Sequence, residues 1–495
     1  MIKFLSIFQK QDITANGFAK LFTYLSIRLG EVPLIEKFRE AHKKKLHLPR
    51  MQVKTSYRQI ISISAPIMLG SAAQNVVALS DSVFLYHRSE GDFAAIGFVG
   101  VFYLVVAAIG FGFSKGGQIM IARRMGEGQK EEVGRTFYAM LYYEFALSVI
   151  LFLFMQYGCY YFFSLFVNSE MIFEKSLEYL EYRSYGVFFS YTGVALIALY
   201  TGVARTSFII VDTAILAVVN IVLNYGLIFG KWGLPEMGIA GAGLASTIAE
   251  VVAFIVFIIY MYFDKEASAY KLFSLPKIDL ELIKVQFKLA SPIVAQALVG
   301  LGSWFIFFSI IEGLGERPLA ITNLGRMVYL ILSIPCWGFA SGVNTLVSNL
   351  IGQQKRQAVV PIIWKTAKLC LATTLLFAIP VVLFPHELLY PLLGGQDMSL
   401  ITEARPVFFV LLLILICFSV GGVFFNGLAG TGATYFGLKI QFWSAIGYLV
   451  YIYYIVNYTQ ADLPWAWAGE IFYWLAITVV TIWYLLSKKW HGLQV

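Results

Sequence analysis

Long apolar segments separated by short polar turns run through this chain from about residue 57 to residue 487. Each segment approaches or exceeds about 20 residues, the length that an α-helix needs to cross the hydrocarbon of a bilayer. The pattern predicts twelve membrane-spanning helices, near 57–82, 92–122, 133–157, 179–203, 208–230, 238–263, 282–312, 317–350, 358–384, 403–430, 434–458 and 465–487. The second and the eighth are longer than a perpendicular span requires, so we expect them to tilt, to bend at their glycines or to extend into the cytoplasm.

The apolar pattern is also duplicated. A shift of 226 residues pairs Pro66 with Pro292, Gly112 with Gly338, Gly116 with Gly342 and Gly126 with Gly352; a shift of 225 pairs Gly202 with Gly427 and Thr206 with Thr431. Prolines and glycines in apolar helices bend them or let backbones approach closely, so the duplicated property is a backbone shape. Two copies of a helical bundle facing each other commonly form a cavity that opens alternately to either side of the membrane.

This pattern predicts an all-α integral membrane protein with two pseudo-symmetric lobes of six spans each. We expect a cytoplasmic or interfacial arm at 1–54, a first lobe at 55–263, a cytoplasmic linker at 264–281, and a second lobe with a short cytoplasmic tail at 282–495. Apolar side chains between residues 4 and 25 could form the buried face of an interfacial helix. A poorly structured arm is the alternative for that segment.

Composition agrees with insertion into a membrane, since 59% of the residues are apolar and 13% are charged, about half the usual charged share of a soluble protein. The net charge of +8 does not indicate nucleic-acid binding, because most of the 37 lysines and arginines fall in turns on one side of the predicted bundle. Only Lys115 and Arg326 are assigned to positions within or near spans. The positive-inside rule then places both termini in the cytoplasm.

The reactive residue types are poorly placed for catalysis. The five histidines lie in predicted tails or outer turns, and the four cysteines have no paired spacing. These positions disfavour a buried histidine base, a histidine-bound metal and a disulfide framework. The sequence contains no Gly-x-x-x-x-Gly-Lys-Ser/Thr loop of the kind that binds ATP. We therefore expect a transporter without a cofactor and not an enzyme.

Acidic side chains inside predicted spans are candidate functional groups, because a carboxylate in a bilayer is costly and usually faces a cavity or a partner. Asp81 lies toward the outer end of the first span, and Gln74 precedes it by two helical turns on the same face. Glu250 lies in the sixth span. Glu144 and Glu470 are two further acids, for which helix pairing is the simpler interpretation.

The fifth and sixth spans contribute neutral polar groups. Asn220 and Asn224 stand on one face of the fifth span, and Ser246 precedes Glu250 by one turn in the sixth. The two amides could clasp a neighbouring helix, or they could offer oxygens to a cation beside Asp81. One carboxylate with a few neutral oxygens suits a single Na⁺ or an exchanging proton. A basic drug could compete for the same charge.

Six short motifs stand in a fixed order between residues 65 and 246. They are Ala-Pro-Ile at 65–67, Leu-Ser-Asp-Ser at 79–82, Asp-Phe-Ala-Ala-Ile-Gly at 92–97, Gly-Val-Ala-Arg-Thr at 202–206, Asn-Ile-Val-Leu-Asn at 220–224 and Gly-Ile-Ala-Gly-Ala-Gly-Leu-Ala-Ser at 238–246. With this order and spacing the chain resembles the multidrug and toxic compound extrusion (MATE) transporters over about 55–490. That family consists of cation-coupled antiporters within a wider group that includes flippases for lipid-linked oligosaccharides.

The resemblance implies a V-shaped antiporter that expels small organic cations in exchange for H⁺ or Na⁺. Asp81, Asn220, Asn224 and Ser246 match its ion-coupling positions, with Asp81, Asn220 and Asn224 as ligands if the ion is Na⁺. Gln74 matches a cavity glutamine, and from their own positions we assign Glu250 and Pro66 to the substrate cavity as well. We expect a monomer in the inner membrane, with the lipid bilayer as its other partner.

Two departures limit the resemblance. One branch of the family carries a glutamate in the seventh span and an aspartate in the tenth, where this chain has Gly300 and Ser419. The repeat places Asp81 on Phe307, so we expect the first lobe alone to carry the ion coupling. The alternative function is a flippase for a lipid-linked glycan or another amphiphilic lipid, which would call for several cationic side chains in the cavity. Only Lys115 and Arg326 are candidates for that role.

Overall fold

The computed structural model of the chain describes residues 55–393, 398–459 and 461–493. The predicted arm at 1–54 lies outside the described residues. Within them the fold is all-helical: the α-helices are accompanied by one π-helical turn, η1 (Phe154–Gly158), and two 3-10 turns, η2 (Arg356–Ala358) and η3 (Lys489–Gly492). The described residues form one compact unit.

The first half of this unit contains α4 (Tyr57–Arg88), α5 (Glu90–Glu127), α6 (Lys130–Leu153), α7 (Cys159–Ser164), α8 (Glu170–Gly202), α9 (Ser207–Phe229) and α10 (Gly238–Phe263). Serine side chains define several of the starts. Ser56, Ser89 and Ser169 each accept a hydrogen bond from the backbone N–H three residues later, which satisfies a donor that the first turn of a helix leaves free. Ser89 alone separates α4 from α5.

The second half follows a short linker helix, α11 (Lys265–Ala269). It contains α12 (Leu280–Glu312), α13 (Glu316–Leu332), α14 (Ile334–Gly352), α15 (Val359–Leu383), α16 (Pro385–Leu393), α17 (Met398–Gly430), α18 (Thr434–Tyr458) and α19 (Leu463–Leu486). The eighth predicted span, 317–350, is a broken pair, because α13 and α14 meet at a bend of 43°. The break lies at Ser333 and not at a glycine, since Pro335 occupies the first turn of α14 and fits best at a helix start.

Among the described residues, ten helices are long and apolar enough to cross a membrane, or eleven if the pair α13–α14 is one span. Helix α18 coincides with the predicted span 434–458 but is rich in tyrosine and is not among those candidates. The total of twelve spans and the cytoplasmic position of the termini stay predictions.

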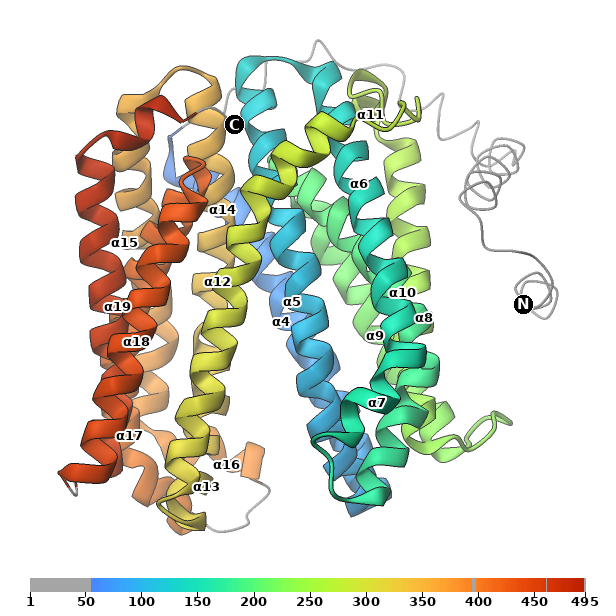
Figure 1. The fold of residues 1–495 in the computed structure, drawn as a ribbon, viewed down its shortest axis with the longest axis vertical. Helices are drawn as coiled ribbons and strands as arrows, with labels where there is room; N and C mark the ends of the chain where they lie inside the picture. The colour runs from blue at the N-terminus through green and yellow to red at the C-terminus, as the bar shows by residue number, and fades with distance from the viewer. Residues whose placement is uncertain (1–54, 394–397, 460, 494–495) are drawn as a thin grey trace. The chain divides into compact units, whose positions relative to one another are not determined.

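The two halves share one packing pattern. In the first half α8 packs against α5, α6 and α10, and α9 packs against α4 and α10. In the second half α17 packs against α14, α15 and α19, and α18 packs against α12 and α19. Figure 1 shows the long helices side by side, with α5 next to α12 where the two sets meet. The sequence repeat therefore corresponds to a repeated bundle.

The halves meet along a seam formed by α4, α5, α12 and α14. The duplicated glycines supply its closest contacts: Gly112 faces Val294 and Gly338 faces Met68, Gly116 faces Ala290 and Gly342 faces Ser64, and Gly126 faces Gly352. The shift of 226 converts the first contact of each of the first two pairs into the second, and it converts the Gly126–Gly352 contact into itself. The repeat thus places residues without side chains where the two backbones approach most closely.

Polar contacts reinforce the same seam. The Lys115 ammonium of α5 donates to Asn426 Oδ1 of α17 at 2.6 Å, and the Ser348 hydroxyl of α14 donates to the Ile119 carbonyl of α5 at 2.6 Å. These residues lie toward the end of the bundle where α4 and α12 begin. The seam is therefore closed at that end.

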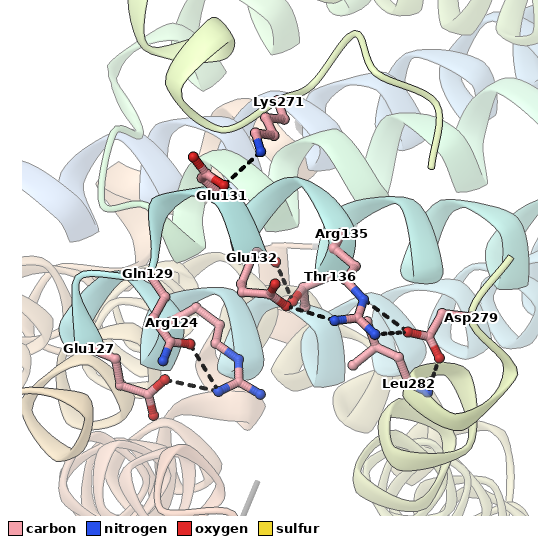
Figure 2. Close-up of polar contacts among 10 residues, drawn as sticks. All are labelled: Arg124, Glu127, Gln129, Glu131, Glu132, Arg135, Thr136, Lys271, Asp279 and Leu282. Carbon is pink, nitrogen blue, oxygen red and sulfur yellow. Dashed lines mark hydrogen bonds and ion pairs between the residues drawn. The ribbon is translucent and has the colours of Figure 1, made fainter. Parts of the chain in front are cut away.

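The linker is held against α6 (Figure 2). Arg135 of α6 donates to the Asp279 carboxylate at 2.5 and 2.9 Å, and Lys271 pairs with Glu131 at 2.6 Å. Asp279 also accepts the Leu282 backbone N–H at 3.0 Å and so caps the start of α12. The Leu282 N–H and the Arg135 guanidinium hold the pKa of Asp279 below its usual range. One carboxylate therefore ties α6 of the first half to the first helix of the second.

Candidate functional site

Four polar side chains from three helices form a closed hydrogen-bonded ring in the first half. Asn224 Nδ2 donates to Asp81 Oδ1 at 2.5 Å and to Asn220 Oδ1 at 3.0 Å. Asn220 Nδ2 donates to Ser246 Oγ at 3.0 Å, and the Ser246 hydroxyl donates to Asp81 Oδ2 at 3.4 Å. All four side chains are buried, and Asp81 is 8% exposed. The structure thus brings together the four residues that the sequence nominated for ion coupling.

Local sequence explains why these side chains meet. Asn220 and Asn224 are one helical turn apart on α9 and share its buried face, as the four-residue spacing requires. The α9–α10 connection returns tightly, because Gly241 lies against the Leu227 backbone and the Met237 N–H donates to the Leu227 carbonyl at 2.8 Å. This close approach lets Ser246 of α10 reach Asn220.

Two oxygen atoms of the ring are available to bind a cation. The Asn224 Oδ1 atom is buried and has no hydrogen-bond partner, and the Asp81 Oδ2 atom is contacted only at 3.4 Å by Ser246. In the described part of the chain, no group of three or more histidine, cysteine, aspartate or glutamate residues is arranged to hold a metal ion. One carboxylate beside neutral oxygens fits a proton or a small monovalent cation, as the sequence suggested.

The residues assigned to a substrate cavity lie outside the ring. Gln74 is exposed on α4, although it shares a face with the buried Asp81. Glu250 lies one turn beyond Ser246 on α10 and accepts two hydrogen bonds from Arg183 of α8, at 2.5 and 2.7 Å. The Glu250 carboxylate is therefore engaged in an ion pair with another helix.

Arg183 is a functional candidate that the sequence analysis did not name. It is 6% exposed within α8, and its guanidinium lies 4.0 Å from the centre of the Tyr103 ring. The positive charge of Arg183 also attracts the Asp81 carboxylate electrostatically. The predicted fourth span, 179–203, already includes position 183, so the span boundaries alone could have identified this residue.

Pro66 is buried in α4, which continues through it without a break. A proline leaves the carbonyl four residues earlier without its helical donor, and here that group belongs to Ser62. The Thr206 hydroxyl donates to the Ser62 carbonyl at 3.2 Å and to the Ile63 carbonyl at 3.0 Å. In the second half the counterpart hydroxyl of Thr431 donates within its own turn, to Leu428, at 2.7 Å. The repeated threonine therefore clasps the proline helix only in the first half.

The other acidic and basic side chains singled out in the predicted spans also contact specific partners. Glu144 of α6 accepts the Ser114 hydroxyl of α5 at 2.7 Å, and Glu470 of α19 accepts the Trp304 indole N–H of α12 at 2.7 Å. Each acid connects two helices. Arg326 lies 5.2 Å from the centre of the Phe308 ring.

A family model described as MatE matches residues 66–226 and 292–455, which is more than half of the chain. The two matched segments begin at the repeated prolines Pro66 and Pro292, so the model finds the duplication independently.

Curated relatives cover most of the chain. It is 25% identical over 458 residues to a probable multidrug resistance protein NorM of Thermotoga maritima, covering 90% of this chain and 96% of that protein. A protein described in the same words from Synechocystis is 26% identical over 312 residues, covering 62% of this chain and 66% of the relative.

Solved structures of similar fold include an outward-facing multidrug resistance MATE family transporter, with a TM-score of 0.82, 18% identity, and coverage of 90% of this chain and 98% of that one. A MATE protein in complex with MaL6 gives a TM-score of 0.80, with 18% identity over 87% of this chain and 96% of that one.

Proposed function

We propose that this chain, which belongs to the MatE family, is a multidrug efflux transporter that exchanges small organic cations for H⁺ or Na⁺ by alternating access. The multidrug resistance proteins to which it is similar support the class of substrate. The observation that carries the ion coupling is the buried ring in which Asp81 has neutral partners from α9 and α10. The proposed exchange of an organic cation for an ion bound at this ring uses no cofactor and no catalytic step.

The ring suggests where a proton would bind. Asp81 Oδ1 already accepts a short hydrogen bond from Asn224, whereas Oδ2 has only the longer contact with Ser246. A proton on Oδ2 would let Asp81 donate to the Ser246 oxygen, and the serine hydroxyl would rotate away. Protonation also removes a charge that is costly to keep in a membrane interior. Na⁺ would instead be held by Asp81 with the side-chain oxygens of Asn220 and Asn224.

Ion binding is linked to movement through α4, which carries both Asp81 and Pro66. The proline section of α4 is held by Thr206 and also packs at the seam against α14. A change in the ring that shifts α4 is therefore transmitted to the contact between the halves. Release of the organic cation follows from that shift.

We assign the observed conformation to the outward-facing state. The seam contacts through Gly116, Gly342 and Lys115 lie toward the end where α4 and α12 begin. The positive-inside rule places that end in the cytoplasm, with both termini on the same side and the protein in the inner membrane. The transporter is proposed to act as a monomer.

The cations within the spans do not support the flippase alternative. Lys115 is bound to Asn426, and Arg183 is paired with Glu250. Arg326 of α13 lies against the ring of a phenylalanine in α12. Each of the three contacts a protein group, whereas a pyrophosphate site would require several cationic side chains directed at the ligand.

Reconstituted vesicles test the proposed function. A panel of cationic dyes is loaded, and H⁺ and Na⁺ gradients are imposed separately. We expect dye export under at least one gradient and loss of export in the Asp81→Asn variant. Export that needs neither gradient, or movement of labelled lipid without movement of any dye, would contradict the proposal.

A further inference from the structure

The second half contains a buried carboxylate in a cage of aromatic side chains. Glu470 is 3% exposed and accepts the Trp304 indole N–H at 2.7 Å. The Tyr448 hydroxyl and the Trp474 indole N–H lie close to the same carboxylate, but their contacts are longer or less well aligned than that of Trp304. Tyr448 is itself only 3% exposed. Two further neutral donors therefore lie beside an acid that already has one close partner.

This cage occupies the position in the second half that the Asp81 ring occupies in the first. Its members come from α12, α18 and α19, which are the counterparts of α4, α9 and α10 in the repeated packing. Under the shift of 225, Glu470 falls on Ala245, next to Ser246, and Tyr448 falls on Leu223, next to Asn224. The residue types differ, but a buried carboxylate stands at the same three-helix junction in both halves.

The surroundings leave the charge of Glu470 without a counter-ion. Within the described residues Glu470 forms no ion pair, and the ionisable groups that face it are the phenols of Tyr329, Tyr448 and Tyr473. The charged residues on the packed helices are exposed or engaged elsewhere: Glu281, Lys284, Lys288 and Glu312 of α12, Glu316, Arg317 and Arg326 of α13, Glu403 and Arg405 of α17, and Lys439 of α18. Neutral donors alone compensate a buried charge incompletely.

From this geometry, and resting on the proposed function, we propose that Glu470 is a second proton-exchanging carboxyl that is loaded and emptied in the same transport cycle as Asp81. The proton would bind the carboxylate oxygen nearest Tyr448, and the new O–H would donate to the Tyr448 oxygen. The Trp304 N–H would continue to donate to Oε1. Trp304 and Trp474 are the partly exposed members of the cage, and Trp304 links the acid to the surface of α12.

Proton release measures this directly. Full-length protein in detergent and weak buffer receives tetraphenylphosphonium, and a pH-sensitive dye reports the protons released. Since ligand binding and protonation are linked, we expect the wild type to release about twice as many protons as either Asp81→Asn or Glu470→Gln. Full release from Glu470→Gln with reduced release from Asp81→Asn would overturn this inference and leave the proposed function intact. Absence of release from the wild type would contradict proton coupling at both sites.

A second measurement needs no substrate. Infrared difference spectra of the same proteins between mildly acidic and alkaline pH should contain a carboxylic-acid band that Glu470→Gln lacks and Asp81→Asn keeps. Trp304→Phe keeps the carboxyl group and removes its donor, so the loss of the proton should shift to higher pH, whereas Trp337→Phe, whose indole bonds Ser333, should leave it unchanged. A spectrum with no band that depends on Glu470, or no shift in Trp304→Phe, refutes the site. Size-exclusion profiles verify that each variant is folded.

Discussion

At the scale of single residues, the Asp81 ring closes because an asparagine amide both donates and accepts hydrogen bonds. Asn220 accepts from Asn224 and donates to Ser246, so each member of the ring is oriented by the next. A leucine at position 220 would keep the helix but would interrupt the ring. The chemistry of the site thus depends on side chains that carry no charge as much as on Asp81.

Asp81→Asn should abolish coupled transport without unfolding the protein. The amide keeps an oxygen that can accept from Asn224, but it can neither release nor bind a proton at neutral pH. We expect gradient-driven dye export in vesicles to fall by about tenfold or more. Glu178→Gln, an exposed acid on α8, serves as the control and should export normally. Undiminished export by Asp81→Asn would remove Asp81 from the mechanism.

Thr206→Val should destabilise the protein through α4. The change removes the part-buried bond to the Ser62 carbonyl and the buried bond to the Ile63 carbonyl, and loss of a buried hydrogen-bond partner costs about 1–3 kcal/mol. We expect a lower melting temperature in detergent for Thr206→Val and near wild-type stability for Thr206→Ser. Thr431→Val is the matched control, because it removes only local bonds, to the Leu428 carbonyl and from the Ala433 N–H. Equal losses for the two valine variants would show that the clasp on α4 has no special role.

At the scale of elements, the linker is held by specific contacts to α6. Asp279 caps α12 while Arg135 of α6 binds its carboxylate, so the first helix of the second half starts from a point attached to the first half (Figure 2). Such a joint limits the directions in which the halves can move. It also gives one surface residue an influence on helix placement.

Asp279→Ala should lower stability by about 1 kcal/mol, the usual effect of losing an N-cap side chain. Asp462→Ala is the matched control, because Asp462 stands at the start of α19 without a capping hydrogen bond. Because the pKa of Asp279 is lowered in the folded protein, its contribution is complete above the ordinary aspartate pKa of about 3.9. The contribution is lost as the pH falls through the lower folded value. Melting curves should therefore show a constant difference from the wild type between about pH 5 and pH 8.

At the scale of the whole molecule, the two halves touch through a seam that is itself duplicated. Gly116 faces Ala290 just as Gly342 faces Ser64. A transporter that alternates between two states must separate this seam and close it again. Residues without side chains permit a close contact that polar groups such as Lys115 then hold.

Gly116→Val should impair transport by preventing closure of the seam. A Cβ atom at this position would lie 3.2 Å from the Ala290 Cα atom and 2.6 Å from its Cβ atom, so the two backbones must separate. Gly97→Val on the same helix is the control, because a Cβ atom there would meet nothing within 4 Å. We expect Gly116→Val to lose most dye export while each half stays folded, and Gly97→Val to export normally. Normal export by Gly116→Val would show that seam closure is not required.

The sequence by itself determined the features that depend on spacing along the chain. Apolar length predicts most of the helices, the paired prolines and glycines predict the two equivalent bundles, and the order of six short motifs indicates the family. The four-residue spacing of Asn220 and Asn224 and the intramembrane position of Asp81 single these residues out, and the family resemblance groups them with Ser246 as one site. These properties follow from helix geometry and from the cost of burying polar groups in lipid.

Only the tertiary structure decided which groups meet across helices. In the structure Glu250 pairs with Arg183, the eighth span bends at Ser333, and Thr206 binds the proline section of α4. The structure also sets Glu470 at the junction equivalent to that of Asp81, although the repeat aligns Asp81 with Phe307. Such contacts depend on how helices distant in sequence are rotated and spaced, and spacing along one chain carries no measure of the distance between two helices.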